Sequence, residues 1–289
     1  MDFFSDLMLI VKDNLDSENI QYDPALISDD PKNVFMQYLD YRNRRISNVP
    51  RIVHYSAEIL ASDEFSEYKD KVENLERIAT IGGNLSPFQT RQLYNLDFTD
   101  PLLNDWNIQH LHLGDHLDEE LFCSGTSSLL YGFFNETDAY FIAIMDHHSF
   151  SELNLLEIMD NNWPTIIDKH VAHDIVDVQY HYNSQEIHQL RKAGVLGIVR
   201  LNSGKVLMPM GGGYSTAHTS IKSMQDYIFY SNLIAAAEKF VSDNKKYVID
   251  NIGTNDLNLI HLIYIDSKRF VLSSSSSKEE LIVEFNSTV

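Results

Sequence analysis

The chain has 289 residues, of which 44% are hydrophobic, so it is long enough for one large domain or two ordinary ones and can bury a core. Its 42 acidic and 22 basic residues give a formal net charge of −20, which repels nucleic acid and anionic membranes. No apolar run approaches the roughly 20 residues of a membrane span, and the N-terminal segment carries acids where a secretory signal carries bases. We therefore expect a cytoplasmic protein without membrane association, in which the one cysteine, Cys123, forms no internal disulfide.

Residues 1–84 are expected to form a helical N-terminal region. A first helix is indicated by apolar residues at helical spacing, namely Phe3, Leu7, Ile10 and Val11. A second helix is predicted to start at Asp30-Pro31, and a third to cover Phe65 to Thr80 and stop at Gly82-Gly83. Ser86-Pro87 has the composition of a further helix start.

Residues 85–170 are expected to contain an antiparallel β-meander. Its strands are predicted over Trp106–Leu113, Ser128–Phe134 and Ala139–Met145, and Asn135–Asp138 forms the hairpin between the last two. A capped helix over Ser151–Met159 follows and ends before Pro164.

Residues 171–289 are expected to hold further mixed strands and one long helix. Strands are predicted over residues 175–182 and 195–210, with a hairpin turn at Asn202-Ser-Gly204 and a short helix around His188 and Arg191. The long helix runs from about Thr219 to Asn251, before three closing strands over residues 257–265, 269–272 and 281–285. The fold class is therefore α+β, and the domain boundaries after residues 84 and 170 are soft.

Histidines mark the candidate site. Nine of the twelve lie between His110 and His188. His110 and His112 are two residues apart on a predicted strand, so both side chains point to the same face. His147 and His148 follow the third strand, and one of them is expected to approach His112 from across the middle strand.

Acid–base catalysis is the chemistry that paired imidazoles suggest, because a neutral imidazole both accepts and donates protons near pH 7. In RNA cleavage one group takes the 2′-hydroxyl proton and the other protonates the leaving oxygen. His110, His112, His147 and His148 are the candidate catalytic residues, and Arg91 is a candidate phosphate contact. This chemistry needs no cofactor. The plainer alternative is that His110 and His112 are core or rim histidines in a non-catalytic binding or regulatory protein.

A metal site is a separate hypothesis. The spacing His110-x-His112-x-x-x-His116 is similar to ligand spacings in small β-fold sites for zinc or a similar divalent metal.

A glycine-rich turn precedes the long predicted helix. Gly211, Gly212, Gly213 and Ser215 are candidates for anion binding through backbone N–H groups at a helix N-terminus. The alternative is a tight structural turn that docks the helix, with a Ser or Thr as its cap. The segment is neither a Walker loop nor a dinucleotide fingerprint.

Residues 85–150 resemble the bacterial ribonuclease toxins of the RelE/ParE type in architecture. The likeness rests on a helix followed by the three strands, Trp106-Asn-Ile-Gln-His-Leu-His-Leu113, Ser128-Leu-Leu-Tyr-Gly-Phe-Phe134 and Ala139-Tyr-Phe-Ile-Ala-Ile-Met145 with its following Asp-His-His. It implies a short antiparallel sheet that meets mRNA, in a toxin- or defence-type ribonuclease. Such toxins are small and basic and often use Lys, Arg or Tyr, whereas this chain is long and acidic and offers His. The expected partners are RNA or another protein.

Three further segments also resemble bacterial proteins of unknown function, which implies no activity. They are His110-Leu-His-Leu-Gly114, Asn162-Trp-Pro164 and Gly211-Gly-Gly-Tyr-Ser215.

Overall fold

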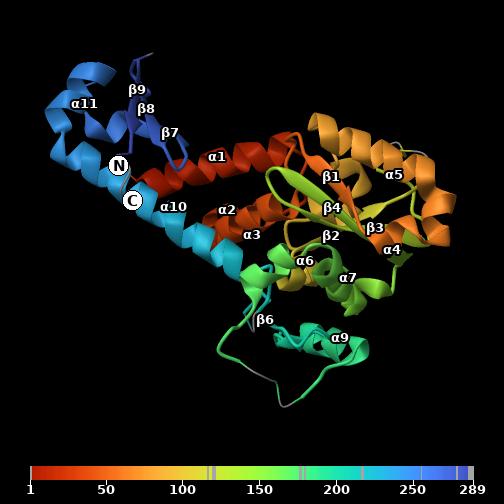
Figure 1. Cartoon of the computed structure of the whole chain (residues 1–289). Helices are drawn as coiled ribbons and strands as arrows, with labels where there is room; N and C mark the ends of the chain where they lie inside the picture. The colour runs from red at the N-terminus through yellow and green to blue at the C-terminus, as the bar shows by residue number, and fades with distance from the viewer. Residues whose placement is uncertain are drawn as a thin grey trace. The chain divides into compact units, whose positions relative to one another are not determined.

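The computed structural model describes residues 2–115, 117–118, 122–175, 178, 180–215, 218–254, 256–277 and 279–285 (Figure 1). The chain divides into two compact units, which we call unit 1 (Met1–Leu39 with Ser223–Val289) and unit 2 (Asp40–Lys222). Helices and mixed sheets confirm the α+β class. The boundaries expected after residues 84 and 170 stay a prediction.

Unit 1 combines helices from the beginning of the chain with a small sheet from its end. The three closing strands form an antiparallel sheet in the order β7-β8-β9. Helix α1 lies against this sheet, where the Asp6 carboxylate accepts a hydrogen bond from the Leu262 amide at 2.9 Å. The elements of this unit are α1 (Phe3–Ser17), α2 (Leu26–Asp29), most of α3 (Pro31–Arg44), most of α10 (Ile221–Asp243), α11 (Lys245–Ile252), the 3-10 turn Leu257–Leu259, β7 (Ile260–Ile265), β8 (Arg269–Ser274) and β9 (Glu280–Glu284).

The long helix is interrupted, which corrects the expectation of one helix to Asn251. Helix α10 ends at Asp243, Asn244 leaves the helical conformation, and α11 begins at Lys245. The Asn244 side-chain amide donates to the Phe240 carbonyl at 2.9 Å. Short polar side chains that bond nearby backbone groups in this way are common where a helix ends, and Asn244 stands at the N-cap position of α11.

Unit 2 is built on a four-stranded sheet in the order β1-β4-β3-β2. The antiparallel strands β2 (Ile108–His112), β3 (Ser128–Phe134) and β4 (Asp138–Asp146) are the expected meander. A fourth strand, β1 (Ile52–Tyr55), pairs with β4 in parallel and was not predicted. β1 has four residues and lies at a sheet edge inside a segment that is otherwise helical, so it carries almost no periodic signal.

Helices cover both faces of this sheet (Figure 1). On one face α4 (Ala57–Leu60) and α5 (Asp63–Ile81) bury a cluster that includes Leu111, Leu113 and Phe141. On the other face lie α6 (Pro101–Trp106), α7 (Asn154–Asn162) and α8 (Pro164–Ile167), whose cluster includes Ile108 and Tyr131. Alternation along β2 therefore sends Leu111 to the α5 side and Ile108 to the α6 side.

The rest of unit 2 is less regular than the sequence pattern suggests. Helix α9 (Ser184–Lys192) starts with a capping box of Asn183 and Glu186. The strand expected over residues 195–210 is a small hairpin of β5 (Val199–Arg200) and β6 (Val206–Leu207) around the predicted turn, where Gly204 has a φ of 89°. The described residues of 175–182 form no strand. The 3-10 turns are Ser86–Phe88, Arg91–Tyr94, Ser149–Ser151 and Asp168–His170.

Two helix starts also differ from expectation. Ser86-Pro87 begins only a 3-10 turn, and the helix expected from Ser151 begins at Asn154 after the turn Ser149–Ser151. None of the helices in the described part of the chain has the length and apolar character to span a membrane.

Candidate functional site

Strand β2 brings His110 and His112 to one face of the sheet. They pair in register with Tyr131 and Leu129, which belong to the cluster on the α6 and α7 side, whereas Leu111 packs toward α5. The two imidazole centroids are 6.1 Å apart. The i, i+2 spacing thus gives the shared face that the sequence pattern predicts.

His147 joins this pair from the end of β4. Its ring centroid is 5.5 Å from that of His112. Its Nε2 lies 2.7 Å from the Thr126 carbonyl oxygen, so Nε2 carries a proton and donates it there. His148 is exposed, and its backbone N–H donates to Asp146. Of the two neighbouring histidines, His147 is the one that approaches His112.

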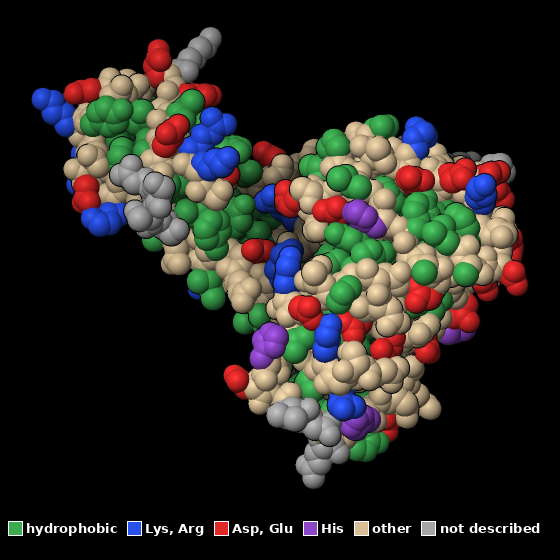
Figure 2. All heavy atoms as spheres, in the orientation of Figure 1, with side chains coloured by type: hydrophobic (Ala, Val, Ile, Leu, Met, Phe, Trp, Pro, Cys, Tyr) green, Lys and Arg blue, Asp and Glu red, His purple; other side chains and the backbone are tan. Residues whose placement is uncertain are grey.

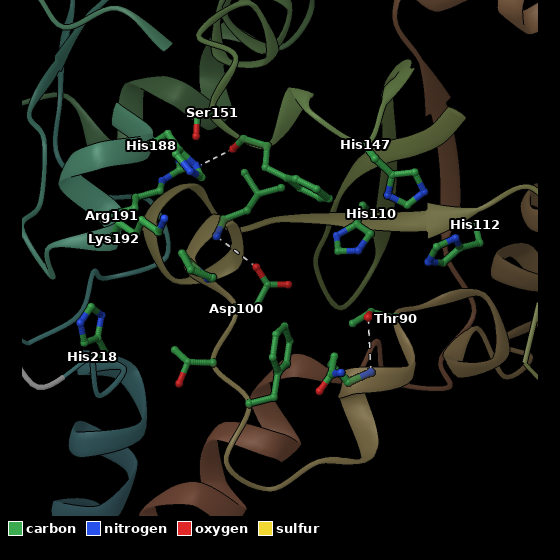
Figure 3. A pocket seen from close by; sticks show the side chains of 16 residues that line it. Thr90, Asp100, His110, His112, His147, Ser151, His188, Arg191, Lys192 and His218 are labelled. Carbon is green, nitrogen blue, oxygen red and sulfur yellow. Dashed lines mark hydrogen bonds between the residues drawn. The ribbon is translucent and has the colours of Figure 1, made fainter. Parts of the chain in front are cut away.

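His110, His112 and His147 line a cavity of about 620 Å³ in unit 2. Figure 3 shows His110, His112 and His147 together on one side, and His188, Arg191 and Lys192 of α9 on another; we call these two sides the histidine wall and the α9 wall. His218 and Asp100 also border the cavity. The other lining residues are Thr90, Gln92, Phe98, Thr99, Pro101, Leu102, Phe150 and Ser151.

Burial keeps the imidazoles of His110 and His112 neutral at pH 7. It lowers the pKa of His110, and it lowers that of His112 to about 4, with His110 and His147 adding to the effect. The Nδ1 atoms of His110 and His112 are both buried, and neither has a hydrogen-bond partner among the described residues. A neutral His112 at pH 7 is available to accept a proton from a bound molecule.

Arg91, the expected phosphate contact, is not among the residues that line the cavity. It forms an ion pair with Asp118, and its guanidinium lies 5.5 Å from the centroid of the Phe122 ring. Its two neighbours, Thr90 and Gln92, line the cavity instead. Arg91 therefore lies outside the cavity lining, but its charge is near enough to add to the lowering of the His112 pKa, and its role as a phosphate contact stays a prediction.

Among the described residues that line the cavity, Arg191 is the arginine. Its Nε donates to the Asp105 carboxylate at 2.9 Å, its Nη1 donates to the Phe150 carbonyl, and its guanidinium lies 4.1 Å from the centroid of the Trp106 ring. The sequence pattern places Arg191 only in a short helix. The usable signal was the spacing of His188, Arg191 and Lys192, which places three basic side chains on one face of that helix.

The glycine-rich turn has no amide left for an anion. The N–H groups of Gly211, Gly212 and Gly213 donate to the carbonyls of Asp105, Pro209 and Asn104 at 3.0, 3.1 and 2.7 Å. The side chain of Ser215 accepts a hydrogen bond from the Thr219 amide at 3.3 Å. This geometry favours a tight structural turn over an anion site at the three glycine amides, and docking of the long helix by this turn stays a prediction.

His116, the third ligand of the zinc hypothesis, lies outside the described residues. Within the described part of the chain, no group of three or more His, Cys, Asp or Glu side chains is arranged to hold a metal ion. The zinc site thus stays a prediction that rests on His116.

Comparison with known proteins gives no match: no family model, no curated protein and no solved structure is similar to this chain. The likeness to the RelE/ParE-type toxins stays a prediction.

Proposed function

We propose that this protein is a metal-independent ribonuclease whose acid–base pair is His112 and His147. The observation that carries the proposal is the 5.5 Å separation of these two imidazoles on one wall of the cavity. Two imidazoles at this separation can reach the attacking and leaving oxygens of one phosphodiester group.

The proposed reaction forms one P–O bond and breaks another. Neutral His112 takes the proton of the ribose 2′-hydroxyl, and the 2′-oxygen attacks the phosphorus. The bond from phosphorus to the 5′-oxygen breaks, and this oxygen takes a proton from the Nδ1 of protonated His147. The products are a 2′,3′-cyclic phosphate and a 5′-hydroxyl end.

Local contacts support this assignment of roles. The pKa of about 4 leaves His112 unprotonated at neutral pH, and it also makes His112 a weaker base than an imidazole that titrates near pH 7. The Thr126 carbonyl retains the Nε2 proton of His147, so the proton that His147 exchanges must be on Nδ1. His110 lies next to His112, with the two ring centroids 6.1 Å apart.

In this proposal the substrate is RNA and the setting is that of a cytoplasmic toxin- or defence-type protein. The non-catalytic alternative, in which the cavity only binds RNA or a protein partner, is an outcome of the test.

The test is cleavage of labelled RNA by the purified full chain in excess chelator, from pH 5 to pH 8. We expect cyclic-phosphate products, and a loss of at least about 100-fold in rate for His112→Gln and for His147→Gln, since each general acid or base contributes roughly 10²–10⁴-fold. His148→Gln is the matched control, because His148 is exposed and does not line the cavity. Absence of cleavage by the wild type across this range would leave the non-catalytic alternative.

A further inference from the structure

We infer that the α9 wall is a subsite for a second phosphate of the bound nucleotide, distinct from the phosphate that is attacked at the histidine wall. The inference rests on the proposed function for the identity of the ligand as a nucleotide. Its own basis is a set of buried and unused hydrogen-bond donors on this side of the cavity.

The α9 wall consists of basic side chains from one helix. His188, Arg191 and Lys192 are at positions i, i+3 and i+4 of α9, so they share one face of that helix, and all three line the cavity (Figure 3). Among the described residues of the lining, Arg191 is the arginine and Lys192 is the lysine. In a chain of net charge −20, a phosphate that enters this cavity meets the Lys192 ammonium here, beside the guanidinium that Arg191 shares with Asp105.

Arg191 is a preorganised donor. Its side chain is only 6% exposed, and Asp105, the Phe150 carbonyl and the Trp106 ring hold it in place. Its Nη2 atom is nevertheless buried with no hydrogen-bond partner among the described residues. A buried donor without a partner is unfavourable, and an accepting ligand oxygen would satisfy it.

Ser151 supplies a second unused donor beside Arg191. It follows Phe150, whose carbonyl binds Arg191, and it is 5% exposed. Its Oγ is likewise buried without a partner among the described residues, and the residue lines the same cavity. A phosphate carries about two negative charges at pH 7 and three accepting oxygens, which matches a hydroxyl, a fixed guanidinium and the nearby Lys192 ammonium.

The remaining lining suits the nucleoside that would link two phosphates. Phe98, Leu102 and Phe150 give the cavity an apolar surface, and aromatic rings are the usual stacking partners of unpaired bases. A cavity of about 620 Å³ is within the range that holds a small ligand. The ligand class is therefore a nucleotide with phosphates on both sides of one nucleoside.

The experiment is titration calorimetry of the full chain with uridine 3′,5′-bisphosphate and with uridine 3′-monophosphate. We expect the bisphosphate to bind at least about tenfold more tightly to the wild type. Lys192→Gln, Ser151→Ala and Arg191→Lys should each remove most of that advantage; Arg191→Lys keeps a cation beside Asp105 but loses the planar fork. Lys69→Gln removes an equal charge from α5, outside the cavity lining, and should keep the full advantage.

The outcomes separate this inference from the proposed function. Equal affinity of the wild type for the two nucleotides, or binding of neither, overturns the subsite even if RNA is cleaved. A bisphosphate advantage that Lys192→Gln and Ser151→Ala abolish supports the subsite even if RNA is not cleaved. Melting curves check that each variant is folded, and the Lys192 and Ser151 variants decide the matter if Arg191→Lys does not fold.

Discussion

At the scale of single residues, the two buried imidazoles of β2 make folding sensitive to acid. His110 and His112 have lower pKa values in the folded chain than the ordinary 6.5, and that of His112 is about 4. Below pH 6.5 the unfolded chain therefore binds protons that the folded chain does not. Stability should fall as the pH drops from about 6.5 to about 4, by at most about 1.4 kcal/mol per pH unit for each fully titrating group.

We predict that His112→Asn flattens this dependence. Urea unfolding at pH 7, 5.5 and 4.5 would measure it, and the wild type should lose more free energy of unfolding over this range than the variant. His173→Asn, which changes an exposed histidine, should match the wild type. Parallel curves for the wild type and His112→Asn would contradict the argument that burial lowers the pKa of His112.

The shared face of His110 and His112 could be predicted because it depends only on the two-residue period of a strand. The choice of His147 over His148 required the end of β4 and the Thr126 carbonyl, 21 residues away in sequence. The spacing of His188, Arg191 and Lys192 indicates a basic helix face, but the place of Arg191 in the cavity depends on Asp105, 86 residues away in sequence. Arg91 was nearer in sequence to the meander, and the sequence gives no sign of its ion pair with Asp118.

At the scale of elements, locally encoded features were predictable and non-local ones were not. The meander follows from alternating apolar strands and a short hairpin, and α5 ends near Gly82 as its glycine signal indicates. The edge strand β1 was missed because its pairing partner, β4, is more than 80 residues away. The apolar pattern of the long helix continues past Asn244, so the pattern alone does not indicate the interruption between α10 and α11.

The glycine-rich turn before α10 is closely packed against the backbone of α6 at Gly211. A Cβ on Gly211 would overlap the backbone carbonyl oxygens of Leu103 and Asn104 in and near the last turn of α6. Gly211→Ala should therefore destabilise the protein by about 1–3 kcal/mol or more, because backbone cannot move aside as a flexible side chain does. Chemical denaturation would measure the loss.

Gly125→Ala is the matched control for this change, because a Cβ there meets nothing within 4 Å. It should alter the free energy of unfolding by less than about 0.5 kcal/mol, as is usual for a surface substitution. Equal stability of Gly211→Ala and Gly125→Ala would show that the turn is not closely packed on α6.

At the scale of the whole molecule, unit 1 joins the two ends of the sequence. The Phe3 amide donates to the Glu238 carboxylate at 3.0 Å, and Asp6 binds both His261 and Leu262. These partners are 235 or more residues apart, and a pattern-based analysis of neighbouring residues has no access to such pairs. Composition, in contrast, is a property of the whole chain, so the net charge of −20 follows from the sequence alone.

That charge predicts how the proposed ribonuclease should discriminate between substrates by length. A long RNA places many phosphates near an acidic surface, whereas a dinucleotide places its few phosphates in the cavity, near Arg191 and Lys192. At low salt the repulsion reaches far, with a Debye length of about 30 Å at 0.01 M, and it shortens to about 8 Å at 0.15 M. We therefore expect kcat/KM for a 30-nucleotide RNA to rise relative to that for a dinucleotide as salt is raised between these concentrations.

Parallel cleavage assays on the two substrates would measure this ratio of kcat/KM values, with the His112→Gln variant as the background. A ratio that falls steeply with salt is the behaviour of a basic nucleic-acid surface that releases counterions, and it would mean that long RNA binds to a positive region outside the cavity.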